Sequence, residues 1–198
     1  MEVSQQPAPK ANIVTLEIEE RLIPSALLPL KLSGLHLNAK HAIASTGGAL
    51  TIVNDTVLIA DRHENFFFYR PNDKRFSRAK YPTLPSNRKA FNAWGAHGSS
   101  SYFRVHDIEY AEIADKGYVI ASHESFDINL KQTRMAVHRL QIDPSSLSPL
   151  GDWHLLFESI PLPIAEDYFA NGGGGRLATK GKSVYLTIGD YNQDGVFV

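Results

Sequence analysis

The sequence predicts an all-β protein, and three observations lead to this prediction. Short runs of β-branched and aromatic residues recur along the chain, turn-forming residues separate them, and helical periodicity is scarce. A motif of two glycines, one variable residue and leucine also occurs twice, at residues 47–50 and 174–177. Such repeated strand units predict a partial β-propeller made of four-stranded antiparallel blades.

The composition allows one sizeable hydrophobic core and excludes some classes of function. The chain has 198 residues, of which 43% are hydrophobic and 21% charged, and its formal net charge is −1. This charge gives no global field that would attract nucleic acid or an anionic membrane, so we expect neither partner. No cysteine is present, which excludes disulfides, thiolate metal sites and a cysteine nucleophile.

The N-terminal region is expected to be a flexible lead over residues 1–20, followed by an incomplete propeller domain over residues 21–198. Residues 1–12 contain neither the basic nor the apolar region of a signal peptide. The apolar stretch 22–37 is interrupted by prolines, a lysine and a histidine, so it is too short and too broken to span a bilayer. We therefore expect no membrane span.

The first unit after this region is expected to be an antiparallel meander. Residues 49–53, 56–60 and 66–69 are strand-like runs joined by short turns. The aromatic run 66–69 is better explained by core packing than by stacking on nucleic-acid bases, which would need a basic sheet face. The basic segment 70–89 is interpreted as a solvated loop between blades, with anion binding as the alternative.

Two further units follow the first. The strands expected in them cover residues 106–110, 118–122, 133–142, 153–158, 176–179 and 184–188. Ile108 stands in the second unit where Leu50 and Leu177 stand in the others, and Asp61 and Asp190 end equivalent strands. Repeats spaced roughly 60 to 70 residues apart suit four-stranded blades with long loops. The chain would then hold about three blades, the last one unfinished.

The segments from His106 onward resemble a known family. HDIEYAEI, KGYVIASHES and TRMAVHRLQID, followed by GGGGRLATKGKSVYLTIGD, are similar to soluble quinoprotein glucose dehydrogenases and to glucose/sorbosone dehydrogenases, which oxidise aldoses. The ordered pattern G-R-L, turn, strand, T-I-G-D over residues 174–190 is the most specific part. The resemblance covers residues 47–198 and implies about half of a six-bladed propeller.

The resemblance implies a PQQ-dependent sugar dehydrogenase, with a small-molecule sugar as substrate, PQQ and Ca²⁺ as cofactors, and a periplasmic or secreted location. Gly175 and Arg176 are then the candidate cofactor-binding residues. The family's histidine base stands four residues before the arginine of G-R-L; here that position is Gly172, which cannot accept a proton. The family's cofactor-binding glutamine would fall near Phe103. We therefore expect the chain on its own to show no dye-linked aldose oxidation.

Two histidines could replace the missing base. His106 opens a strand beside Asp107, and His123 ends a strand beside Glu124. A neighbouring carboxylate can orient an imidazole and raise its basicity, so His106 and Asp107 form the candidate catalytic pair. The alternative for either histidine is a packing role at a strand end. Four other histidines show no metal-ligand spacing: His63, His97, His138 and His154.

The C-terminal residues DYNQDG fit the first half of a calcium loop. Asp190, Asn192 and Asp194 alternate along the chain, so their oxygens could gather on one Ca²⁺ ion. The same residues also suit a plain turn. The glycine run 172–175 is expected to form a turn at the rim of a blade, since the G-K-[ST] of a phosphate loop does not follow it. The alternative function is a non-catalytic propeller that binds a carbohydrate or a protein, with or without calcium at this loop.

Overall fold

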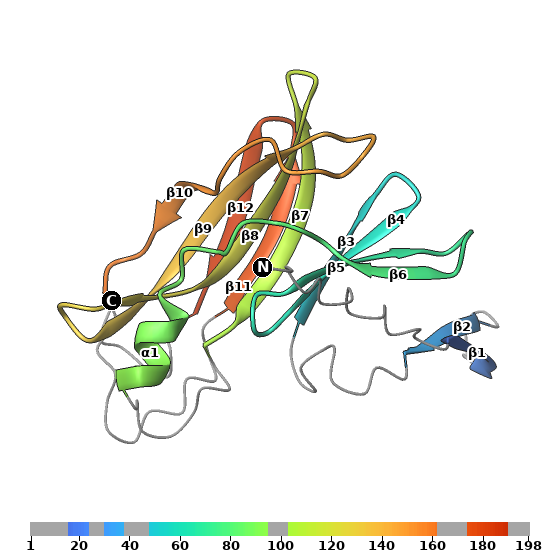
Figure 1. Ribbon diagram of the computed structural model, residues 1–198, viewed down its shortest axis with the longest axis horizontal. Coiled ribbons are helices and arrows are strands. Elements are labelled where there is room, and N and C mark those ends of the chain that lie inside the picture. The colour runs from blue at the N-terminus through green and yellow to red at the C-terminus, as the bar shows by residue number, and fades with distance from the viewer. Residues whose placement is uncertain (1–15, 24–29, 38–47, 95–102, 162–173, 190–198) are drawn as a thin grey trace, which may run out of the picture. The chain divides into compact units, whose positions relative to one another are not determined.

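The computed structural model describes residues 16–23, 30–37, 48–94, 103–161 and 174–189 (Figure 1). The chain divides into two compact units, Met1–Ala42 and Ile43–Val198. Within the described ranges all strand pairs are antiparallel and the single helix is short, so the fold is all-β as predicted. No helix among these residues is long and apolar enough to cross a membrane.

The described residues of the first unit, 16–23 and 30–37, form one hairpin. Strand β1 (Leu16–Ile23) pairs with β2 (Leu30–Leu37), and the register runs from Leu16 opposite Leu37 to Ile23 opposite Leu30. Strand β1 begins inside the range expected to be the N-terminal lead. Apolar and polar residues alternate at the start of both strands, as in LEIE of β1 and LKLS of β2, and this pattern favours extended structure.

The second unit opens with a four-stranded sheet in the consecutive order β3-β4-β5-β6. The predicted meander is confirmed by β3 (Gly48–Val53), β4 (Thr56–Asp61) and β5 (Phe66–Arg70). The prediction of a continuous loop over residues 70–89 is wrong, because this segment contains β6 (Arg75–Arg78) and the start of α1 (Arg88–Trp94). Cross-strand packing outweighs the local charge: Phe76 lies opposite Tyr69 and stacks on Phe67.

A second four-stranded sheet has the order β10-β9-β8-β7, again consecutive along the chain. Its strands are β7 (Val105–Ile113), β8 (Lys116–Asp127), β9 (Gln132–Ile142) and β10 (His154–Glu158), all of which the sequence predicted. Strand β8 is longer than expected. Asp127 ends it, and its carboxylate accepts hydrogen bonds from the backbone N–H groups of Asn129 and Leu130.

The last described sheet is the hairpin of β11 (Gly174–Lys180) and β12 (Ser183–Ile188). Gly174 and Gly175 lie in β11, not in the predicted rim turn. The register shifts between Gly174 and Leu177, and this irregularity allows φ values of 67° and 85° at the two glycines. Gly172 lies outside the described residues.

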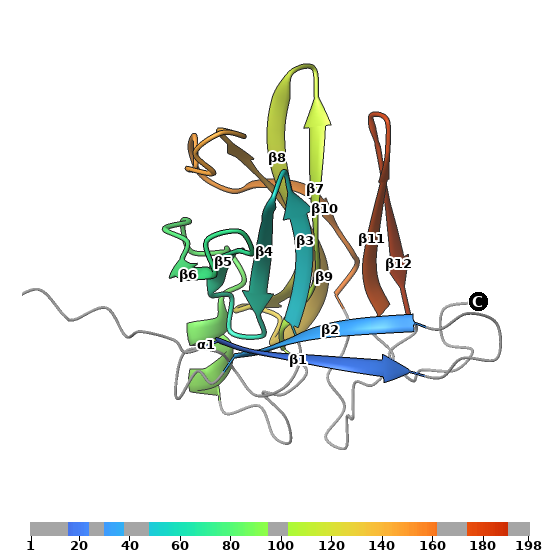
Figure 2. The same ribbon diagram turned by 90° about the vertical axis from the view of Figure 1, so that its right-hand side faces the viewer.

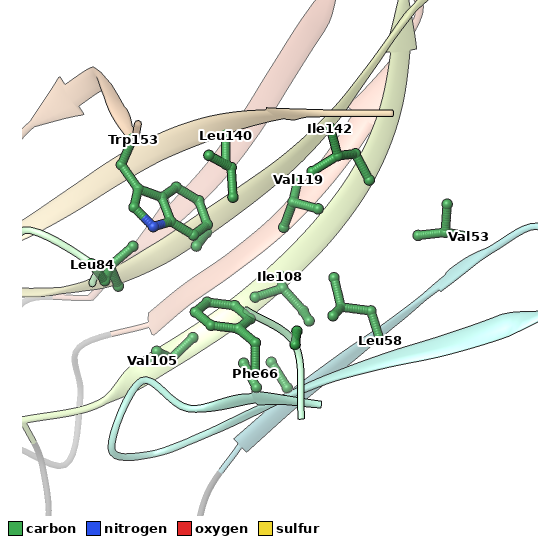
Figure 3. Close-up of a cluster of buried hydrophobic side chains, with 14 of the residues drawn as sticks. Val53, Leu58, Phe66, Leu84, Val105, Ile108, Val119, Leu140, Ile142 and Trp153 are labelled. Carbon is green, nitrogen blue, oxygen red and sulfur yellow. The ribbon is translucent and has the colours of Figure 1, made fainter. Parts of the chain in front are cut away.

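The sheets pack through their first strands: β3 packs on β7, and β11 packs on β7 and β8. Figure 2 shows the hairpins β3–β4, β7–β8 and β11–β12 extending in a similar direction. The main core lies between the two four-stranded sheets (Figure 3) and includes Leu58, Phe66, Ile108, Val119, Leu140 and Trp153. Between β11–β12 and the second sheet, Ala111, Ile120 and Val137 form a smaller core with Leu177, Val184 and Leu186. Neither four-stranded sheet closes on itself.

Equivalent residues of the three sequence repeats, at positions 50, 108 and 177, differ in burial. Ile108 of β7 is fully buried in the core shared with the first sheet, and Leu177 of β11 packs against the second sheet. Each side chain therefore faces the sheet that precedes its own along the chain. Leu50 of β3 is 64% exposed, and Ile52 on the same face is 63% exposed.

Candidate functional site

A β-bulge in β7 turns His106 and Asp107 toward β11. Val105 lies opposite His123 and Asp107 lies opposite Ser122, so His106 is the extra residue of the bulge. His106 and Asp107 are both buried. Bulges of this kind redirect side chains, and here two consecutive residues contact the same neighbouring strand.

The Asp107 carboxylate holds β11 in place. One oxygen (Oδ2) accepts a 2.9 Å hydrogen bond from the backbone N–H of Leu177 and lies 3.5 Å from Nε of Arg176. The other oxygen accepts a 3.0 Å hydrogen bond from the N–H of Ile108. Asp107 is therefore bonded to Leu177, Arg176 and Ile108, which joins the candidate catalytic residue to a candidate cofactor-binding residue.

The carboxylate nearest the His106 imidazole belongs to Glu124 of β8. Oε1 of Glu124 lies 3.7 Å from Nε2 of His106, a distance that is too long for a hydrogen bond. Nε2 is buried and has no hydrogen-bond partner among the described residues. Burial raises the pKa of Glu124, and this effect exceeds the opposite influence of His106, Arg104 and Arg88.

Gly175 covers His106 from the side of β11. A Cβ atom added to Gly175 would lie 2.5 Å from Cβ and 2.7 Å from Cγ of His106. The Gly175 carbonyl accepts a hydrogen bond from the hydroxyl of Ser122, which is fully buried. The G-R-L motif thus packs its glycine on the candidate base and directs the Arg176 side chain, 72% exposed, toward solvent.

A second carboxyl group of β7, Glu109, lies on the same side. Burial is the largest cause of its raised pKa and the Asp107 charge is the next. Hydrogen bonds with Thr179 of β11 and Thr51 of β3 act in the opposite direction. Burial and the neighbouring Asp107 carboxylate therefore determine the direction in which the pKa of Glu109 moves.

Sequence reasoning missed a buried pair of histidines. Nε2 of His123 lies 2.9 Å from Nδ1 of His138, and Nδ1 of His123 lies 2.9 Å from the carbonyl oxygen of Glu124. The carbonyl requires a proton on Nδ1 of His123, so in the neutral pair Nε2 accepts the hydrogen bond that His138 donates. Burial lowers the pKa of His123 to about 3 and that of His138 to about 4. No spacing reveals this pair, because the pairing of β8 with β9 brings the two rings together.

The residues present give PQQ few contacts. Gly175 is packed on His106, so among the two candidate cofactor-binding residues only Arg176 has an exposed side chain. Phe103, at the position expected for glutamine, is buried, stacks on Phe91 at 4.3 Å and lies 5.0 Å below the Arg88 guanidinium. An aromatic side chain in this place offers no hydrogen bond to a quinone. The described residues therefore do not form a binding site for PQQ.

The candidate calcium ligands Asp190, Asn192 and Asp194 lie outside the described residues. Within the described ranges no three His, Asp or Glu side chains are grouped so that they could hold a metal ion. A pocket of about 240 Å³ lies between the β3–β4 and β5–β6 turns and the segment after β9, with Asp55, Arg70 and Asp73 in its lining. Arg70, Asn72 and Asp73 of the basic segment 70–89 line this pocket, and none of the candidate catalytic or cofactor-binding residues does.

No protein-family model matches this chain, and a search of curated proteins finds no match. The buried part of the site combines the His106 imidazole, the Glu124 carboxyl group 3.7 Å from it, and Gly175, which packs on the imidazole. Such a group can hold or move one proton.

Proposed function

We propose that this chain is part of a six-bladed β-propeller related to the soluble quinoprotein glucose dehydrogenases, whose inherited chemistry is PQQ-dependent oxidation of aldoses. Two four-stranded sheets with consecutive strand order support this architecture. The packing of β3 on β7 and of β11 on β7 supports it as well, because a propeller gathers the first strands of its blades around an axis.

The exposed face of β3 also supports a propeller. Ile108 and Leu177 pack on a preceding sheet, whereas the equivalent Leu50 is exposed together with Ile52. A further blade packed on this face would cover the side chains of Leu50 and Ile52. The proposal therefore assigns Leu50 and Ile52 to an interface between blades.

One observation carries the proposed chemistry: the bulge in β7 brings His106 beside a buried carboxyl group and beneath the glycine of the G-R-L motif. Oxidation of an aldose to a lactone removes a hydride from the anomeric carbon and a proton from its hydroxyl group. His106 is proposed to accept the hydroxyl proton, in place of the histidine that Gly172 replaces. The hydride acceptor is proposed to be a quinone because of the family resemblance, since the described residues do not form a binding site for it.

A specific observation favours a second candidate function, a propeller that binds a carbohydrate or a protein without catalysis. Phe103 occupies the position expected for a quinone ligand and completes an aromatic cluster with Phe91 and Phe126. His106 and Gly175 are packed against each other. Under this alternative the contact of His106 with Gly175 stabilises the packing of β11 on β7, and His106 has no chemical role.

An assay of the full-length protein separates the two candidates. The protein would be loaded with PQQ and Ca²⁺ and mixed with aldoses and a redox dye. Sugar-dependent dye reduction that requires the quinone supports the dehydrogenase. Sugar binding by calorimetry without dye reduction, in a preparation shown to contain bound quinone, supports the non-catalytic propeller.

A further inference from the structure

We infer that Glu124 is the positioning residue of the proposed base: its carboxylate fixes a proton on Nε2 of His106 and leaves Nδ1 as the nitrogen that accepts the proton of the substrate. This inference rests on the proposed function. Sequence adjacency suggested other partners, since His106 is followed by Asp107 and His123 by Glu124. The bulge gives His106 a different partner, because it turns the His106 side chain toward the Glu124 carboxyl group.

The contacts of each group leave this role open to Glu124. Asp107 is occupied by Leu177, Ile108 and Arg176. His123 faces away from the Glu124 carboxyl group and bonds to His138 and to a backbone carbonyl. Nε2 of His106, by contrast, is buried, and among the described residues it has no hydrogen-bond partner; the Glu124 carboxyl group lies 3.7 Å away.

Small movements would complete the contact. The distance from Nε2 to Oε1 has to shorten by about 0.8 Å to reach an ordinary N–H···O hydrogen bond. When the ring takes up a second proton, the attraction between imidazolium and carboxylate increases and favours this shortening. The other charged groups that face Glu124 are Arg104, which precedes β7, and Arg88 of α1; both favour the carboxylate form.

The role of Glu124 resembles that of any carboxylate that orients an imidazole: it selects one tautomer and stabilises the imidazolium. Glu124 exerts both effects through His106 and has no contact with the sugar in this proposal. Loss of the carboxylate should lower kcat at least about tenfold, a part of the ~10²–10⁴-fold that a positioned base contributes. KM should change less than about twofold, because substrate binding does not involve Glu124.

The test uses full-length protein with ¹⁵N-labelled histidine and three variants. Glu124→Leu removes both the charge and the acceptor, Glu124→Gln keeps an acceptor oxygen, and Glu64→Gln is the control. Glu64 is also a buried glutamate whose pKa is raised by burial, but it pairs with Arg88. NMR spectra of the ring nitrogens report the tautomer of His106, and the signals are assigned by their loss in His106→Asn.

The inference predicts an Nε2–H tautomer of His106 in the wild type and in Glu124→Gln, and a loss of this preference in Glu124→Leu. Glu64→Gln should leave the His106 signals unchanged. An unprotonated Nε2 in the wild type, or unchanged spectra in Glu124→Leu, would overturn the inference whatever the turnover. If Glu124→Leu does not fold, the wild-type and Glu124→Gln spectra still decide the tautomer.

Turnover then separates this inference from the proposed function. The expected tautomer together with a lowered kcat in both Glu124 variants supports both. The expected tautomer with wild-type turnover retained in both variants overturns the positioning role but leaves the dehydrogenase intact. A wild type that holds the tautomer but oxidises no aldose overturns the proposed function, and with it the catalytic meaning of the contact.

Discussion

Gly175 lies so close to His106 that a Cβ atom on Gly175 would be 2.5 Å from the Cβ atom of His106. Non-bonded carbon atoms do not approach this closely, so a side chain at Gly175 would force β11 or His106 to shift. The φ angle of 85° at Gly175 independently disfavours any residue with a side chain. Glycine at this position therefore determines how closely β11 packs on the bulge of β7.

Substituting Gly175 with alanine should destabilise the protein more than the same change at Gly181. Both glycines have positive φ, but a Cβ at Gly181 would meet nothing within 4 Å. Gly181→Ala should therefore cost only the backbone strain, about 1 kcal/mol. Gly175→Ala should cost about 1–3 kcal/mol more, from the forced movement of β11. Urea denaturation of the two variants checks this, and equal losses would mean that β11 does not press on His106.

Stability should fall in acid because of His123 and His138. Burial lowers their folded-state pKa values to about 3 and about 4, whereas the unfolded chain has the ordinary value of 6.5. Below pH 6.5 the two histidines bind protons in the unfolded state but not in the folded state, so the free energy of unfolding decreases as the pH falls. The decrease ends once the pH has passed the folded pKa values of about 4 and about 3, because the folded state then binds these protons as well. His106 and Arg88 also face His123 and disfavour its charged form.

Urea midpoints measured from pH 7 to pH 4 test this dependence. His138→Asn should flatten the decline relative to the wild type, whereas His154→Asn, at an exposed position of β10, should not. The raised pKa of Glu124 acts in the opposite direction, since it stabilises the fold at low pH and less as the pH rises. A decline that His138→Asn leaves unchanged would assign the acid sensitivity to other groups.

Leu50→Ala tests the proposed interface between blades in the full-length protein. If a further blade covers β3, the substitution should cost about 2–5 kcal/mol, as for a buried leucine. A side chain that remains exposed would change stability by less than about 0.5 kcal/mol. Leu130→Ala is the control, because Leu130 is 53% exposed in a turn that belongs to no repeat. Equal small effects of both substitutions would contradict the propeller.

Calcium should bind weakly if Asp190, Asn192 and Asp194 converge. Three side chains supply about three of the 6–8 oxygen ligands that Ca²⁺ prefers. Calorimetric titration of the wild type should therefore give a weak binding isotherm that Asp190→Ala abolishes. Identical heats in the two proteins, or no heat in either, would leave the segment as a plain turn.

The sequence was informative wherever local pattern decides structure. Alternating apolar residues and Asn-Asp or Lys-Gly turns located the strands of both four-stranded sheets. The error at β6 arose because charged residues such as Arg75 and Arg78 flank Phe76, whose packing on Phe67 is a contact between strands. Val184 and Leu186 alternate along β12, and both pack against the second sheet.

The site was harder to predict for the same reason. His106, Asp107, Gly175 and Arg176 were each selected from the sequence, and the structure brings them together. Their partners were not foreseeable, because a one-residue bulge decides which carboxyl group faces the His106 ring. The pair of His123 and His138 likewise depends on the register of β8 with β9 and has no local signature.

The measurement that tests the central claim most directly is the steady-state oxidation of an aldose by full-length protein loaded with PQQ and Ca²⁺, wild type against His106→Asn. Asparagine cannot accept the hydroxyl proton, so kcat should fall about 10²–10⁴-fold while the affinity for the sugar is retained. His154→Asn, at an exposed histidine of β10, should keep the wild-type rate. Equal turnover by His106→Asn and the wild type would contradict the claim that His106 is the base.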